Sequence, residues 1–339
     1  MIDGTQMKFS NTVIILVSLA GLFIGCASTG SKSDDPRGQY DVFLDGANGE
    51  GLHTAVADKK AAVSATDAHQ KAQNAMASGD MDTALFYYVK AAEADTKDER
   101  ALLGIATVHN QRGNYDLVAL AYRMTVGLNP ENVTATEGLG LELLRKGDRA
   151  EAKTWLLRAI ALDPTRPRAL SGLGIVSDLD RDFAAASAYY EFALELDPDS
   201  PKTLANYGYS RFLSGDLPGA ERLYQRALER DADFAQARLN LGLLYARKGD
   251  ISAAQTEFER VLSRSQTYNE LGFILMTEKN YEQAEQLFQK AISSSPTFFP
   301  QANENLERVR ALRASKEKTT PPAERTPTAT LPKGTKAPD

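Results

Sequence analysis

The sequence predicts an all-α fold: a right-handed superhelical solenoid of about seven helix hairpins, closed by a C-terminal cap helix. A two-residue signal, usually Gly followed by Asp or Asn, occurs at six positions spaced by 34 residues, and Lys279-Asn280 follows after 30. The six pairs begin at Gly79, Gly113, Gly147, Arg181, Gly215 and Gly249. A period in this range is typical of stacked supersecondary units, which bind partners along a surface.

Residues 133–166 illustrate what one unit contains. Apolar residues recur at helical spacing on both sides of a short break. Gly147 is expected to end the first helix, because a left-handed cap residue needs no Cβ. Asp148 is then placed to cap the second helix, and Pro164 ends that helix because proline lacks a donor and clashes with the preceding turn. The unit is therefore predicted to be a helix hairpin.

Columns of small and large residues repeat in phase from unit to unit. The first helix carries a small residue where two helices can approach closely: Ala72, Ala106, Gly140, Gly174, Gly208, Gly242 and Gly272. The second helix carries a large residue: Tyr88, Tyr122, Leu156, Tyr190, Tyr224, Phe258 and Phe288. Proline closes four units.

This set of columns resembles the tetratricopeptide repeat. The resemblance implies a repeat domain over residues 58–314. Its units are 65–98, 99–132, 133–166, 167–200, 201–234, 235–264 and 265–298, with a cap helix over 299–314. The first unit is degenerate and reads as an N-terminal cap. The sixth unit is four residues short, about one helical turn, so we expect its second helix to be shortened after Val261.

The N-terminus carries a second, independent signal. The apolar run from Val13 to Ile24 is too short to span a bilayer and is typical of a signal-peptide core, which predicts a signal peptide over residues 1–25. Gly25-Cys26 directly after the run resembles the lipobox of bacterial lipoproteins. The resemblance implies lipidation of Cys26, and Ala27 after it favours the periplasmic face of the outer membrane. A chance cysteine in a signal sequence cleaved elsewhere is the alternative.

Two segments are expected to lack regular structure. Residues 26–57 are rich in Ser, Gly and Asp and are predicted to be a flexible tether. Within them, Tyr40–Leu44 could be a short adhesive strand or docking peptide, although we favour a partly ordered linker. Residues 315–339 are rich in Pro and Thr and are predicted to be a disordered tail.

Composition argues against several functions. The net charge is −6 and no basic block interrupts the repeats, so nucleic-acid binding is not expected. His53, His69 and His109 do not have metal-ligand spacing, so no metal or other cofactor is expected. No catalytic motif is present, and Asp178 and Asp180 are interpreted as caps or solvated charges rather than as an acid and a base. The sequence therefore does not suggest an enzyme.

The first helices of stacked hairpins are expected to line a concave groove. The positions that should point into it are mostly apolar, namely Leu141, Leu144, Ile175, Tyr209, Phe212, Leu239, Leu243, Phe273 and Met276. Such a row suits an amphipathic helix laid lengthwise in the groove. Alternatively, these side chains pack between neighbouring units and leave no accessible groove.

Tandem repeats behind a lipobox resemble pilus-assembly lipoproteins, in particular the tight-adherence family represented by TadD, with the type IV pilotins PilF and PilW next. That resemblance implies a pilotin that binds a helix of a secretin or pilus component. The alternative is a periplasmic adaptor for peptidases or cell-wall enzymes, as in NlpI-like lipoproteins.

Overall fold

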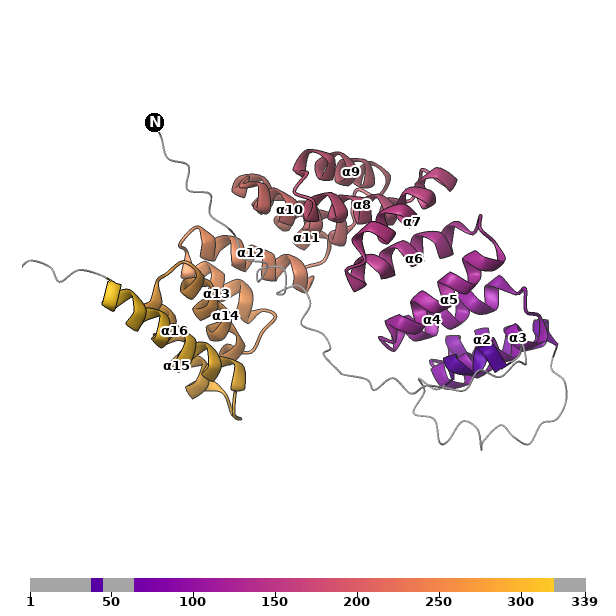
Figure 1. Cartoon of the computed structure of the whole chain (residues 1–339), viewed down its shortest axis with the longest axis horizontal. Coiled ribbons are helices and arrows are strands. Elements are labelled where there is room, and N and C mark those ends of the chain that lie inside the picture. Colours follow the sequence, from indigo (N-terminus) through magenta and orange to yellow (C-terminus); the bar gives the residue numbers. More distant parts are fainter. Residues whose placement is uncertain (1–37, 45–63, 320–339) are drawn as a thin grey trace, which may run out of the picture. The chain divides into compact units, whose positions relative to one another are not determined.

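The structure is a computed structural model that describes residues 38–44 and 64–319. Within these ranges it contains one short 3-10 helix, η2 (Gly38–Phe43), fifteen α-helices and no strand (Figure 1). The predicted all-α class is therefore confirmed. The expected signal peptide, Cys26, most of the tether and the tail beyond residue 319 lie outside the described residues.

The α-helices follow one another with short connections. They are α2 (Ala65–Ala77), α3 (Met81–Ala94), α4 (Glu99–Gln111), α5 (Tyr115–Leu128), α6 (Val133–Lys146), α7 (Arg149–Leu162), α8 (Pro167–Leu179), α9 (Phe183–Leu196), α10 (Pro201–Ser214), α11 (Leu217–Arg230), α12 (Ala235–Arg247), α13 (Ile251–Glu259), α14 (Arg264–Thr277), α15 (Tyr281–Ser294) and α16 (Pro300–Thr319).

The chain divides into two compact units, Met1–Ala237 and Arg238–Asp339, and α12 crosses the boundary between them. In the first unit the hairpins are α2–α3, α4–α5, α6–α7, α8–α9 and α10–α11, and each second helix from α3 to α9 packs on the first helix of the next hairpin. The first helices α6, α8 and α10 also contact one another in sequence. In the second unit α14 packs on α13, α15 and α16. This order of neighbours is that of a helical-repeat solenoid.

Large side chains of the second helices fill the space left by small residues of the first helices. A Cβ on Gly174 would lie 2.6 Å from the ring of Tyr190, and a Cβ on Gly208 would lie 2.6 Å from the ring of Tyr224. Both rings are fully buried. Close packing within the hairpin thus explains the phase of the two columns from the third hairpin onward. In the first two hairpins the rings of Tyr88 and Tyr122 instead meet Gly104 and Gly138, on the first helix of the next hairpin.

Left-handed residues end several of the first helices. Gly147 has φ of 90°, and its N–H donates to carbonyls in the last turn of α6. Arg181 and Lys279 occupy the same position in their hairpins with φ of 61° and 64°. A side chain in this region costs roughly 1–2 kcal/mol, which glycine avoids.

Arg181→Gly should therefore raise the free energy of unfolding by about 1 kcal/mol, once the greater backbone entropy of glycine in the unfolded chain is subtracted. Urea unfolding followed by circular dichroism measures this change. The matched control is Gly147→Ala, for which no clash is expected because nothing lies within 4 Å of the added Cβ. It should lose stability through backbone strain alone, and equal stability of both variants with wild type would contradict this explanation.

The second helix of the sixth repeat is shortened, as the sequence predicts. This helix, α13, has 9 residues, whereas α11 and α15 have 14 each. Helix α14 then begins in a capping box, in which Ser263 and Gln266 satisfy each other's backbone N–H groups. The missing helical turn is thus replaced by an early start of the next helix.

Two segments differ from expectation. Helix α16 runs to Thr319 and so includes five residues, 315–319, that were expected to belong to the tail. They are mostly good helix formers, and the first proline comes only at Pro321. For residues 40–44 the sequence favours a partly ordered linker over a short strand or docking peptide. Tyr40, Phe43 and Leu44 are buried against the first hairpins, which agrees with the docking peptide and contradicts the favoured linker.

Candidate functional site

The nine residues of the predicted groove fall on first helices of both compact units. In the first unit Leu141 and Leu144 lie on α6, Ile175 on α8, and Tyr209 and Phe212 on α10. In the second unit Leu239 and Leu243 lie on α12, and Phe273 and Met276 on α14. All are half-buried except Met276, which is buried. Half-buried apolar side chains both pack against the core and remain accessible to a partner.

We call the five residues of the first unit the apolar row: Leu141, Leu144, Ile175, Tyr209 and Phe212. Their three helices contact one another in sequence, and the Leu141 side chain reaches across to α8, where it approaches the position of a Cβ on Gly172 to 3.0 Å. Leu141 and Leu144 pack on a core cluster with Leu156 and Leu173. Glycine at position 172 therefore lets α6 and α8 come close enough for a continuous surface.

Two aromatic side chains form the α10 part of the apolar row. The rings of Tyr209 and Phe212 are stacked, with centroids 6.1 Å apart. Burial raises the pKa of the Tyr209 hydroxyl, and the Asp178 carboxylate raises it further, so Tyr209 stays neutral. A stacked pair of neutral rings offers a large apolar contact area at low entropic cost.

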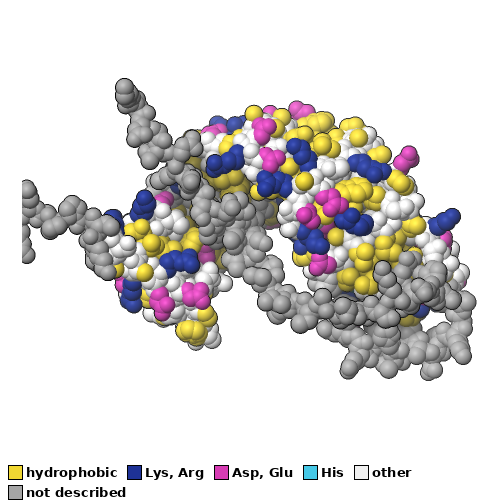
Figure 2. All heavy atoms as spheres, viewed as in Figure 1, with side chains coloured by type: hydrophobic (Ala, Val, Ile, Leu, Met, Phe, Trp, Pro, Cys, Tyr) yellow, Lys and Arg dark blue, Asp and Glu magenta, His cyan; other side chains and the backbone are white. Residues whose placement is uncertain are grey.

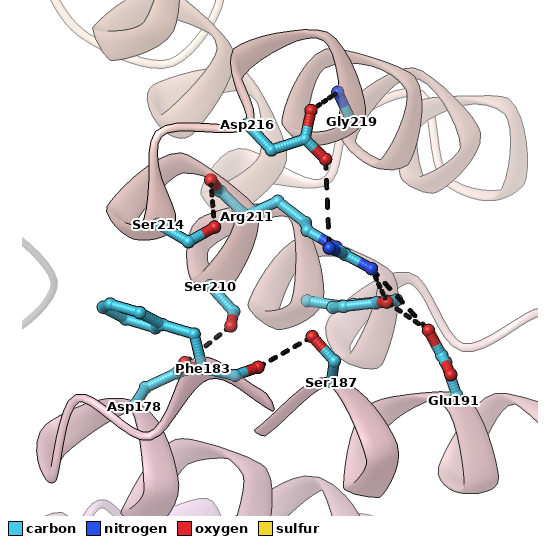
Figure 3. Close-up of polar contacts among 10 residues, drawn as sticks. Asp178, Phe183, Ser187, Glu191, Ser210, Arg211, Ser214, Asp216 and Gly219 are labelled. Atoms are coloured by element: carbon cyan, nitrogen blue, oxygen red, sulfur yellow. Dashed lines mark hydrogen bonds and ion pairs between the residues drawn. The ribbon is translucent and has the colours of Figure 1, made fainter. Parts of the chain in front are cut away.

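Asp178 occupies the position in α8 that corresponds to Leu144 and Phe212, so a carboxyl group interrupts the apolar row. It accepts a hydrogen bond from the Ser210 hydroxyl at 2.6 Å (Figure 3). It also accepts one from the Tyr190 hydroxyl at 2.8 Å. Burial raises the pKa of Asp178 to about 6, and the two hydrogen bonds oppose that rise. The interpretation of Asp178 as a cap or solvated charge was therefore wrong. Asp180, in contrast, is an exposed C-cap paired with Arg149.

The raised pKa of Asp178 predicts a pH-dependent stability. Between about pH 4 and 6 the native state holds a proton that the unfolded state releases, so this contribution is present at low pH and lost as pH rises through 6. Asp178→Asn should keep both hydrogen bonds, because the amide accepts from Tyr190 and donates to Ser210. We expect the free energy of unfolding of the variant to exceed that of wild type by up to about 3 kcal/mol at pH 7.5 and to be close to it at pH 4. Urea unfolding at both pH values tests this, and a difference independent of pH would contradict it.

A second polar network lies beside this carboxyl group. The Arg211 guanidinium donates to the Tyr207 hydroxyl at 2.5 Å, and the same hydroxyl donates to Glu191 at 2.5 Å. Arg211 also approaches Asp216, which caps α11, at 4.0 Å (Figure 3). These contacts tie α10 to α9 and α11, and so they fix the helix that carries Tyr209 and Phe212.

The second unit presents less of the predicted groove. Met276 belongs to a buried cluster with Val309 of α16, and Asn269 accepts a hydrogen bond from Asn305 of α16 at 3.1 Å. The cap helix α16 therefore covers α14 at both Asn269 and Met276. Met276 is not available to a partner in this conformation, whereas Leu239, Leu243 and Phe273 remain half-buried. For Met276 the alternative interpretation, packing between elements, holds.

Neither a candidate metal cluster nor a membrane-spanning helix is found among the described residues. None of their His, Cys, Asp and Glu side chains form a group of three or more that could hold a metal ion. His109 is fully buried, and burial together with the Arg112 charge lowers its pKa to about 4. None of the described helices is long and apolar enough to cross a membrane. On the face drawn in Figure 2, acidic and basic side chains are interspersed rather than gathered in a basic stripe.

Comparisons with known proteins give a consistent result. Three family models, each described as tetratricopeptide repeat, match residues 69–233 in four overlapping pieces, 211–271 and 265–298, which together cover 230 of the 339 residues. A comparison with curated proteins found no match.

Several solved structures share the fold. A tetratricopeptide repeat protein from Parabacteroides merdae aligns with a TM-score of 0.56 at 17% identity, over 73% of this chain and 98% of that one. PilW, described as a type IV pilus biogenesis factor, aligns with 0.51 at 22% identity, over 66% and 97%. PilF from Pseudomonas aeruginosa aligns with 0.50 at 22% identity, over 61% and 95%. Because the repeat models cover two thirds of its length, this chain belongs to the tetratricopeptide-repeat family.

Proposed function

We propose that this protein is a lipid-anchored, non-catalytic scaffold that binds a protein partner through the apolar row, and that it acts as a pilotin-like factor in the assembly of a secretin or pilus. The observation that carries the binding role is the apolar row itself, in which three neighbouring first helices present half-buried apolar side chains, including the stacked pair Tyr209 and Phe212.

The chemistry of the apolar row favours an amphipathic helix as the partner. None of its five side chains is cationic, so it lacks the charge that would hold a C-terminal carboxylate. A helix of a secretin subunit could place residues spaced by three and four positions against α6, α8 and α10. The stacked aromatic pair would then be the main energetic anchor.

The assignment to pilus assembly adds the lipobox to the repeats and the apolar row. Gly25-Cys26 follows an apolar run as in a lipobox, and PilW, which shares the fold, is described as a type IV pilus biogenesis factor. At 22% identity the likeness to PilW carries the fold alone. The pilus role therefore depends on the combination of repeats, lipobox and apolar row.

The lipid anchor is tested by mass spectrometry of the mature N-terminus after expression of the full chain in a two-membrane bacterium. We expect a chain that begins at Cys26 and carries acyl chains, fractionating with the outer membrane. Several acyl chains give an effectively permanent anchor, at roughly 0.8 kcal/mol per buried methylene. Cleavage at another site, or an unmodified Cys26, would refute the anchor. Cys26→Ser is the matched control and should abolish acylation.

The partner is tested by affinity capture with the full chain from cells that carry pilus genes. Tyr209→Ala combined with Phe212→Ala should reduce capture by at least about 30-fold, which corresponds to the loss of about 2 kcal/mol at one anchor. Leu157→Ala on the second helix α7, where the side chain is 44% exposed, is the matched control and should not change capture. Circular dichroism confirms that each variant is folded.

The captured protein decides between the two scaffold functions. Recovery of a secretin or pilus component that is lost in the double variant supports the proposal. If a peptidase or cell-wall enzyme is recovered instead and no secretin, the protein is a periplasmic adaptor and the pilotin role is wrong. Equal capture by wild type and the double variant would remove the apolar row from consideration.

A further inference from the structure

Residues 38–44, which we call the N-terminal segment, are packed on the first hairpins rather than exposed. Tyr40 and Phe43 are 1% and 0% exposed and Leu44 is 9% exposed, whereas Val42 between them is 40% exposed. The spacing of the buried side chains follows one face of the 3-10 turn formed by η2. A segment of only seven described residues thus buries three large apolar side chains.

The contacts of the N-terminal segment lie on α3 and α4. Helix η2 packs on α3, and the Tyr40 hydroxyl donates to the carbonyl of Thr96, in the loop between α3 and α4, at 3.5 Å. The Phe43 ring lies 5.9 Å from the imidazole of His109 on α4. The three side chains belong to one core cluster with Leu85 and Ile105. We call this face of α3 and α4 the segment site.

The segment site has the properties of a peptide-binding site. Its surface is largely apolar. The Thr96 carbonyl accepts a hydrogen bond from the Tyr40 hydroxyl, and the buried His109 imidazole lies against the Phe43 ring. Burial keeps His109 neutral at physiological pH, which suits contact with the Phe43 ring. The ligand it holds belongs to a part of the chain outside the repeats, joined to α2 by the 20 residues between Leu44 and Ala65.

We propose that the segment site is a second peptide-binding site, distinct from the apolar row, and that residues 38–44 are its resident ligand, bound in cis. The sequence pattern that the segment site recognises is a tyrosine, two variable residues, a second aromatic residue and a leucine. Because the ligand is tethered, its effective concentration at the site is in the millimolar range. A separate peptide of the same sequence therefore binds the segment site only when the chain's own residues 38–44 no longer occupy it.

Docking also changes the reach of the N-terminus, a consequence that rests on the proposed lipid anchor. With Tyr40 docked, 13 residues separate Cys26 from the repeats, a span of at most about 45 Å; with it released, 38 residues separate Cys26 from Ala65, a span of at most about 130 Å. The segment site would thus hold the repeats near the membrane. The binding test below does not depend on Cys26, so its failure and the failure of the anchor are separable.

The binding test uses the full chain and a fluorescein-labelled peptide of residues 36–46. Tyr40→Ala combined with Phe43→Ala vacates the site, and the labelled peptide should bind this variant at least tenfold more tightly than it binds wild type, as measured by fluorescence anisotropy. Val42→Ala is the matched control, because Val42 lies in the same segment but is exposed, and it should behave as wild type. A labelled peptide carrying Phe43→Ala should not bind. Equal binding to all three proteins would overturn the proposal.

Two measurements keep the test decisive if the double variant folds poorly. In wild type, hydrogen exchange of the backbone amides of residues 40–44 should be slowed by docking, and exchange at the rate of an unstructured peptide would overturn the proposal. The His109 imidazole, followed by NMR, should titrate near pH 4 in wild type. It should move towards its ordinary value in the vacated variant and return when the peptide is added. Unchanged titration in the folded variant would equally overturn the proposal.

Discussion

Arg166→Ala is expected to lower the free energy of unfolding by roughly 3–5 kcal/mol. The Arg166 guanidinium donates to the carboxylate of Glu137 on α6, and the side chain of Glu137 is only 3% exposed. Removing the arginine would leave a buried carboxylate without its partner, which is far more costly than losing an exposed ion pair. Arg166 is also the N-cap residue of α8, so the pair ties α6 to the start of the next first helix.

The matched control is Arg123→Ala. Arg123 pairs with Glu151 at 3.1 Å, but both side chains are about half exposed, so its loss should cost no more than about 1 kcal/mol. Chemical unfolding of both variants, followed by circular dichroism, measures the two changes. Equal losses in the two variants would show that burial of Glu137 does not set the strength of its ion pair.

Tyr190→Phe and Tyr224→Phe should change stability in opposite directions, although the two residues occupy the same column. The Tyr190 hydroxyl donates to Asp178, and its removal should cost about 1.5–3 kcal/mol because the acceptor is a carboxylate at neutral pH. The Tyr224 hydroxyl is buried without a hydrogen-bond partner among the described residues, since Phe212 stands where Asp178 stands in the previous repeat. Its removal should raise stability by about 1–3 kcal/mol.

Thermal and urea unfolding at pH 7.5 test this pair of substitutions. Each variant is the control for the other, because both remove one hydroxyl from a fully buried ring that packs on a glycine. Destabilisation of the same size in both variants would contradict the assignment of the hydrogen bonds.

The periodicity of the sequence was sufficient to predict the helices. The left-handed glycines, the proline stops and the alternation of small and large columns act within one hairpin or between neighbouring hairpins, and they recur in phase. The short α13 was predictable for the same reason, because a deletion of one turn shifts the phase of every later column.

Features that depend on contacts distant in the sequence were not predictable. From the sequence Asp178 is expected to be a charge at a helix end, but the packing of α10 places the Ser210 hydroxyl in hydrogen-bond contact with it. From the sequence Met276 is expected to line the groove, but in the structure α16 covers it. Residues 40–44 have no repeat to support them, and their burial depends on a surface of α3 and α4 built by later residues. The apolar row was predicted at the level of single positions, but which positions stay accessible depends on the three-dimensional packing.

The central claim, that the apolar row binds a protein partner, is tested most directly by site-specific photo-crosslinking in cells. A benzophenone amino acid replaces Tyr209 in one full-length chain and Leu157 on the second helix α7 in another. We expect the chain labelled at position 209 to form a crosslink to a secretin or pilus component, identified by mass spectrometry, and the chain labelled at position 157 to form none to that protein. Crosslinks to the same partner from position 157 and none from position 209 would contradict the account.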